Sequence, residues 1–135
     1  MKKVLFAYDG SDNSKRAVEQ LIELGKRIGD MEIGVISVVP EADKKLLDQV
    51  PTYGEWHAEC IHKAEKDVDE VCEQLSANGL EAEPIVKVGS PALTIIEEAK
   101  EQGYDTIMIG HRGKLLGSVS IKIIDLSPVA VYIAS

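Results

Sequence analysis

Five short apolar runs rich in valine and isoleucine recur along this chain, and segments with the period of an α-helix separate them. The runs cover residues 4–8, 33–39, 85–88, 106–109 and 129–133. Within them apolar residues follow one another without strict alternation, which is typical of strands that are buried on both faces. This order of buried strands and helices predicts an α/β fold in which crossover helices cover a parallel sheet.

The helical segments between the runs are bounded by start and stop signals. Serine or aspartate caps precede the apolar periodicity, a proline stands at a first helical position, and glycines follow the last periodic residues. We predict helices from Ser11 or Asp12 to Gly29, over about 55–78, from Ser90 and Pro91 to before Gly103, and from near Ser118. The segment 40–54 interrupts this rhythm with two prolines and a glycine, and we expect a mobile connection with a single helical turn there.

Size and charge restrict the class of protein. The 135 residues suit one domain, 1–135, and the longest apolar run is far shorter than the about 20 residues that a membrane helix requires. The formal charge of −8 disfavours binding to the phosphate backbone of nucleic acids. Asp9 and Asp12 interrupt the first apolar run too early for an export signal, and the two cysteines form no metal or redox motif. We therefore expect a cytoplasmic protein with reduced thiols.

Three polar segments that contain glycine follow predicted strands, and parallel strands bring such segments to one edge of a sheet. The first, Asp9-Gly10-Ser11, offers a carboxylate at a tight turn, or simply a cap for the first helix. The second contains Gly89, where the backbone can approach a ligand or merely turn into a helix. The third, 109–120, combines glycines, cations and a hydroxyl before a helix, which is typical of phosphate binding because free backbone N–H groups favour an anion.

These segments resemble the universal stress protein family, in order and over nearly the whole chain. The sequence VLFAYDGS at 4–11 resembles the family's first strand and turn, VISVV at 35–39 its second strand, and VGSPA at 88–92 the turn after its third. The part from Gly110 through SVS at 118–120 to SPVAV at 127–131 resembles the family's characteristic end. The resemblance implies a three-layer sandwich with a five-stranded parallel sheet, Rossmann-like and of the adenine nucleotide alpha hydrolase type.

The resemblance also implies which residues would hold a nucleotide. In nucleotide-binding members of the family, the positions of Asp9 and of the Val39 backbone hold the adenine and ribose side. The other candidate positions, on the ribose and phosphate side or beside it, are Gly89, Ile109, Gly110, Arg112, Gly113, Gly117, Ser118, Val119 and Ser120. ATP or AMP would be the ligand, with Mg²⁺ as the counterion of the phosphates.

One departure from the family pattern leaves two classes of function open. Only three residues separate Gly113 from Gly117, whereas nucleotide-binding members have a longer loop there. The chain is either a stress-response module that binds an adenine nucleotide as a regulatory ligand, or a nucleotide-independent homodimeric module that has lost the triphosphate site through this shortened loop. We do not expect an enzyme, since beyond Asp9 the sequence offers no combined set of groups for phosphoryl transfer. Slow hydrolysis of bound ATP stays compatible with the first class.

The final apolar run is the predicted site of self-association. It begins at Val129 and ends at Ile133, and we expect it at an edge of the sheet. Unpaired backbone groups at such an edge can pair with the same strand of a second chain. The resemblance implies the same homodimer, and the alternative is an edge protected by the terminus alone.

Overall fold

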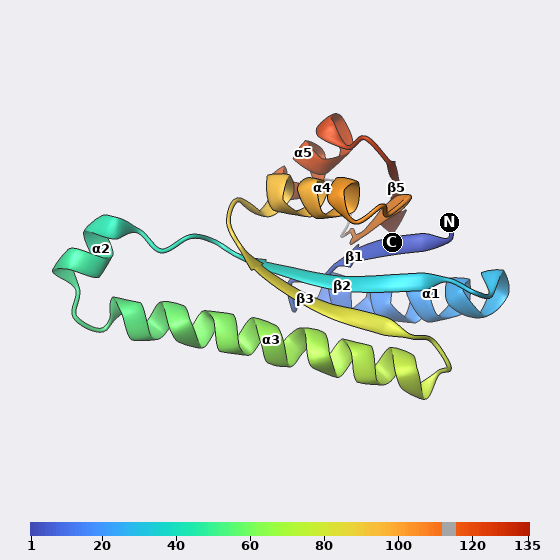
Figure 1. Cartoon of the computed structure of the whole chain (residues 1–135), viewed down its shortest axis with the longest axis horizontal. Helices are drawn as coiled ribbons and strands as arrows, with labels where there is room; N and C mark the ends of the chain where they lie inside the picture. The colour runs from blue at the N-terminus through green and yellow to red at the C-terminus, as the bar shows by residue number, and fades with distance from the viewer. Residues whose placement is uncertain (112–115) are drawn as a thin grey trace.

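The computed structural model describes residues 1–111 and 116–135, and it shows a five-stranded parallel sheet with helices on both faces (Figure 1). The strands are β1 (Lys3–Ala7), β2 (Glu32–Val39), β3 (Ala82–Val88), β4 (Thr106–Gly110) and β5 (Ala130–Ala134). The helices are α1 (Asp12–Ile28), α2 (Lys44–Gln49), α3 (Tyr53–Ala77), α4 (Pro91–Glu101) and α5 (Ser118–Leu126). The strands lie in the order β3-β2-β1-β4-β5, and every neighbouring pair is parallel. The predicted α/β class is confirmed.

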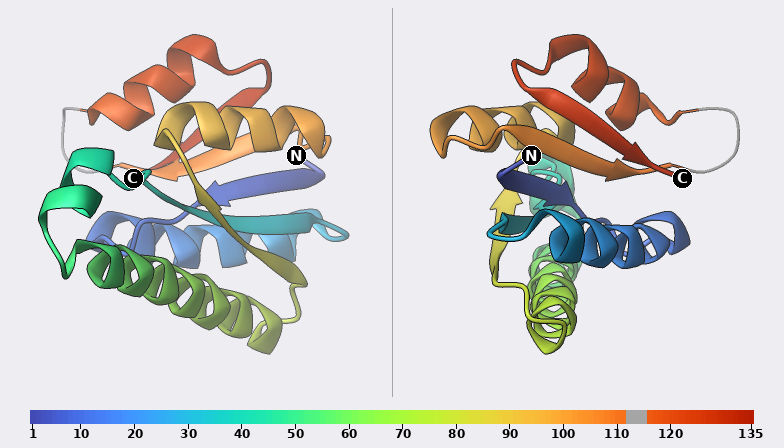
Figure 2. Two further views of the ribbon diagram at one scale, coloured as in Figure 1. Left: turned by 60° about the vertical axis from the view of Figure 1, so that its left-hand side comes forward. Right: turned by 90° about the vertical axis from the view of Figure 1, so that its right-hand side faces the viewer.

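The sheet separates two apolar cores, which gives the three layers that we expected (Figure 2). Successive residues of β1 point to opposite faces, so that Val4 and Phe6 pack in the core beneath α1 and α3 while Leu5 packs in the core beneath α4 and α5. All three side chains are fully buried. A strand covered on both faces needs apolar residues at every position, which explains the continuous run in the sequence.

The first helix begins and ends where its signals predict. The Ser11 hydroxyl accepts a hydrogen bond from the Ser14 backbone N–H at 3.2 Å, which satisfies one of the free N–H groups of the first turn. At the other end Gly29 has a φ of 71°, a left-handed conformation that glycine adopts without strain. This fixed start places the first turn of α1 beside the carboxyl end of β1.

Two elements differ from the predictions. Strand β3 begins at Ala82, earlier than expected, and includes Pro84. Proline is tolerated there because β3 is an edge strand, where one side of the backbone needs no partner. In the segment 40–54 the expected single turn is the 6-residue helix α2, whose first turn donates backbone hydrogen bonds to the Asp43 carboxylate. No residue of α2 is buried, so the sequence has no helical repeat of apolar residues that would predict this helix.

Helix α3 is the longest of the helices, with 25 residues. Its buried residues, Ala64, Val68, Val71 and Leu75, form one stripe that packs on the sheet. Among the described residues no helix is both long and apolar enough to cross a membrane.

Candidate functional site

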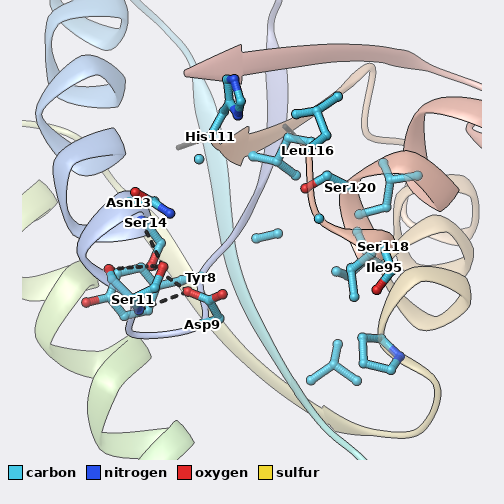
Figure 3. Close-up of a pocket in the computed structure, with 18 of the residues that line it drawn as sticks. Tyr8, Asp9, Ser11, Asn13, Ser14, Ile95, His111, Leu116, Ser118 and Ser120 are labelled. Carbon is cyan, nitrogen blue, oxygen red and sulfur yellow. Dashed lines mark hydrogen bonds between the residues drawn. The ribbon is translucent and has the colours of Figure 1, made fainter. Parts of the chain in front are cut away.

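A cleft of about 430 Å³ opens at the carboxyl ends of β1 and β4 (Figure 3). The chain leaves β1 toward β2 on one side, while β4 pairs with β1 on the other, so this is the point at which the strand order reverses. Ligands of open α/β sheets bind at such a point, and the volume lies within the range of about 300–1,000 Å³ found for small-molecule sites. The cleft is therefore the candidate site.

The Asp9 carboxylate forms one wall of the cleft together with the first turn of α1. Its Oδ1 accepts hydrogen bonds from the Ser11 backbone N–H at 2.9 Å and from the Ser14 hydroxyl at 2.8 Å (Figure 3). Burial acts to raise the pKa of Asp9, but the hydrogen bonds from Ser11 and Ser14 outweigh it and hold the pKa below its ordinary value. Asp9 is thus an anion at neutral pH and is held in one orientation.

Replacing Asp9 with asparagine is expected to destabilise the fold by about 0.5–1 kcal/mol at pH 7, an amount reduced by solvent screening of this exposed side chain. Because the folded-state pKa is depressed, the stabilisation by the carboxylate is present above its unfolded pKa and is lost as the pH falls through its folded pKa. Urea unfolding of wild type and Asp9→Asn at pH 7 and at pH 3 measures the effect. A difference that persists unchanged at pH 3 would contradict this assignment.

The opposite wall is the N-terminus of α5. Its N-cap residue is Gly117, so no side chain caps the first turn. Ser118, Val119 and Ser120 of this turn line the cleft. The backbone N–H groups of a first helical turn have no partner within the helix, and the helix dipole places partial positive charge there. Figure 3 shows Ser118 and Ser120 across the cleft from Asp9. One wall is thus anionic and the other favours an anion.

Two glycines of the cleft have different environments. A Cβ atom on Gly110 would lie 2.8 Å from the Asn13 carbonyl oxygen and 3.1 Å from the Ser14 backbone nitrogen. A Cβ atom on Gly117 would have no heavy atom within 4 Å. Gly110 is therefore required for packing β4 against the first turn of α1, whereas Gly117 borders open space.

The structure brings most of the predicted site residues into one place. Those that line the cleft are Asp9, Ile109, Gly110, Gly117, Ser118, Val119 and Ser120. Val39 lines a second hollow, which it shares with Asp9. Gly89 is not among the described residues that line either hollow, and its N–H donates to the Val39 carbonyl at 2.9 Å. The predicted residues Arg112 and Gly113 lie outside the described residues.

Several residues of the cleft were missed from the sequence. Asn13 and Ser14 come from the first turn of α1, and Ile36 and Ile95 add apolar surface from β2 and α4. The position of Ser14 three residues after the Ser11 cap was a usable signal, because a cap interacts with that residue. His111, which lies within the predicted segment 109–120, also lines the cleft, and its Nδ1 is buried with no hydrogen-bond partner among the described residues.

The chain is an open α/β domain with a ligand-sized cleft at its switch point, the place where such folds commonly bind small molecules. The model of the universal stress protein family matches residues 1–135. The universal stress protein YxiE of Bacillus subtilis is 32% identical over 143 residues, covering 97% of this chain and 97% of YxiE. The chain belongs to the universal stress protein family.

Solved structures show the same fold. The protein MJ0577 of Methanocaldococcus jannaschii superimposes with a TM-score of 0.85 at 23% identity, covering 98% of this chain and 94% of the other. A universal stress protein family protein of Arabidopsis thaliana, solved with AMP bound, gives a TM-score of 0.78 at 21% identity over 99% of this chain and 91% of its own.

Proposed function

We propose that this chain is a regulatory module of the stress response that binds an adenine nucleotide, AMP or ATP, in the cleft between β1 and β4. The observation that carries the proposal is the pair of walls, with ionised Asp9 on one side and the uncapped start of α5 on the other. The AMP bound to the Arabidopsis neighbour supports this choice of ligand.

The chemistry of the cleft fits the parts of a nucleotide. The Asp9 carboxylate can accept hydrogen bonds from ribose hydroxyls or a base amino group, and Ile36, Ile95 and Ile109 offer apolar surface to a base. The hydroxyls of Ser118 and Ser120 and the N–H groups of the first turn of α5 can donate to phosphate oxygens.

Magnesium would accompany a polyphosphate as its counterion. Within the described part of the chain no group of three or more His, Cys, Asp or Glu residues is placed to hold a metal ion. In this proposal Mg²⁺ takes its ligands from phosphate oxygens and water, as it commonly does. In this proposal the described residues contribute groups that bind the phosphates.

We propose binding and not catalysis as the role of the cleft, in a cytoplasmic protein. Asp9 is engaged by Ser11 and Ser14, and among the described residues no histidine is hydrogen-bonded to a serine of the cleft as a general base would be. Cys60 and Cys72 are free thiols, and burial raises the pKa of Cys72 to about 11, which disfavours the reactive thiolate.

Nucleotide binding is expected to raise the melting temperature, because a ligand that binds only the native state stabilises it. At a free concentration about 100 times Kd the gain is about 2.7 kcal/mol, which corresponds to a rise of roughly 8–13 °C for a domain of this size. Thermal melting with AMP, ADP or ATP, each with Mg²⁺, measures it. No rise at millimolar concentrations of any of the three would reject the proposal.

The second candidate function is a nucleotide-independent homodimeric module. Strand β5 is an edge of the sheet, as predicted, and Ile133 on it is 38% exposed. On the neighbouring helix α5, Ile121 and Leu126 are 47% and 54% exposed. We propose that a second copy pairs along β5 in either case, and that dimerisation alone is the function if no nucleotide binds.

A further inference from the structure

A second hollow, of about 270 Å³, lies between the end of β2 and the N-terminal half of α3. We call it the α3 groove; its lining includes Val39, Trp56, Lys63 and Asp67. It shares Asp9 and Val38 with the cleft, but its walls come from the α3 side of the sheet. Figure 1 shows the chain that follows β2 running above the N-terminal part of α3 toward α2. Nothing in the proposed nucleotide function uses its aromatic wall.

Three aromatic rings at the start of α3 form this wall. Tyr53, Trp56 and His57 occupy one helix face, and the ring of Tyr53 lies 5.5 Å from that of Trp56 and 6.4 Å from that of His57. The Tyr53 hydroxyl accepts from the Asp43 backbone N–H at 3.0 Å. The Pro40 carbonyl can only accept, so His57 Nε2 donates to it, at 2.7 Å. These hydrogen bonds hold the rings of Tyr53 and His57, whereas Trp56 is 56% exposed.

The charges of the α3 groove are mainly negative. Carboxylates enter it from three separate segments, on Asp9, Glu41 and Asp67. Among the described residues that line the α3 groove, Lys63 is the lysine. Its Nζ lies 3.0 Å from Asp67 Oδ2. Tyr8 lies beside these carboxylates, and its pKa is raised. Burial is the largest cause, and the charges of Asp67 and Asp9 add to it. The local potential therefore attracts cations and repels anions.

We propose that the α3 groove binds a small organic cation, an aryl- or alkylammonium ion. Its apolar body lies against Trp56, and its ammonium group faces Glu41 and Asp67. Aromatic faces attract cations through their quadrupoles, and burying the exposed face of Trp56 adds an apolar contribution. The volume is just below the range of drug-sized sites, which limits the ligand to a small molecule. This inference does not rest on the proposed nucleotide function, although the α3 groove shares Asp9 with the cleft and is also lined by Val39.

The position of the single tryptophan provides the test, because Trp56 is the only one in the chain and lies in the α3 groove. The full chain is titrated with phenethylammonium, 2-phenylethanol and phenylacetate, which share an aromatic ring and differ in charge. We expect a saturable change of Trp56 fluorescence with phenethylammonium and an affinity at least about fivefold higher than for the alcohol. We expect no saturation with phenylacetate.

Two variants locate the charge effect. Glu41→Gln and Asp67→Asn are each expected to weaken phenethylammonium binding at least about threefold while leaving the affinity for the alcohol unchanged. Asp125→Asn, which removes an exposed carboxylate on α5 across the sheet, is the matched control and should change neither. Equal affinity for all three probes, or no saturation up to about 20 mM, overturns the proposal. The proposal is also overturned if both groove variants keep the wild-type preference for phenethylammonium over 2-phenylethanol.

Discussion

Replacing Gly110 with alanine is expected to lower the melting temperature by roughly 6–10 °C, a loss of about 2 kcal/mol. The added Cβ would lie 2.8 Å and 2.9 Å from the carbonyl oxygen and carbon of Asn13. These are backbone atoms of the first turn of α1, which cannot rotate away as a flexible side chain can. Either the turn moves, and with it the Ser11 and Ser14 contacts to Asp9, or β4 is displaced.

Gly117→Val is the matched control for this prediction. The position has φ −71° and ψ 166°, which any residue adopts, and an added Cβ meets nothing within 4 Å. We expect a melting temperature within about 4 °C of wild type, since the added side chain meets no clash and only the preference for glycine over valine at an N-cap opposes it. The same variant is expected to abolish the rise in melting temperature on adding nucleotide, because valine occupies space beside the α5 N-terminus. Equal loss of stability in both variants would contradict the distinction between the two glycines.

Ile133→Pro is expected to weaken the proposed dimer and to raise its dissociation constant at least about 10-fold, because each of the two copies loses one strand-pairing hydrogen bond worth about 1 kcal/mol. The Ala134 carbonyl accepts from His111 N–H, so the backbone of Ala134 faces β4. Backbone groups of alternate residues point to opposite sides of a strand, so Ile133 presents its N–H to the outer edge. Ile133→Pro therefore removes an outward donor and leaves the β4 pairing in place.

Sedimentation of wild type and Ile133→Pro at matched concentrations measures the dimer. Ile133→Val keeps both the N–H and the β-branched side chain, and it should remain dimeric. An unchanged melting temperature of the monomer at low concentration shows that the proline variant is folded. A proline variant that sediments as the wild-type dimer would place the interface away from β5.

The parts of the fold that the sequence predicts are those where one local signal decides the outcome. The Ser11 cap and the left-handed Gly29 bound α1, and the continuous apolar residues of β1 follow from its burial on both faces. The same holds for the walls of the cleft, since Asp9 ends a buried strand and Ser118 begins a helix. Strand ends and helix starts are fixed by neighbours in sequence, and the parallel sheet then brings them together.

The features that the sequence does not predict depend on neighbours distant in the chain. Pro84 argues against a strand unless β3 is known to be an edge. Gly110 and Gly117 are both glycines, and only the close approach of the Asn13 backbone to Gly110 distinguishes them. The α3 groove exists because the end of β2 meets the start of α3, and no motif in either segment indicates it.

The strand order also has a consequence for the nascent chain. In the finished sheet β1 is interior, paired with β2 from Lys3 opposite Glu32 and with β4 from Val4 opposite Thr106. During translation β2 emerges soon after β1, whereas β4 is made roughly 5–20 s after β1 at ordinary rates of synthesis. For that interval β1 is an exposed apolar edge, with the aggregation risk that such an edge carries. A chain released before β4 is made would therefore be an aggregation-prone fragment, although it already contains three of the five strands.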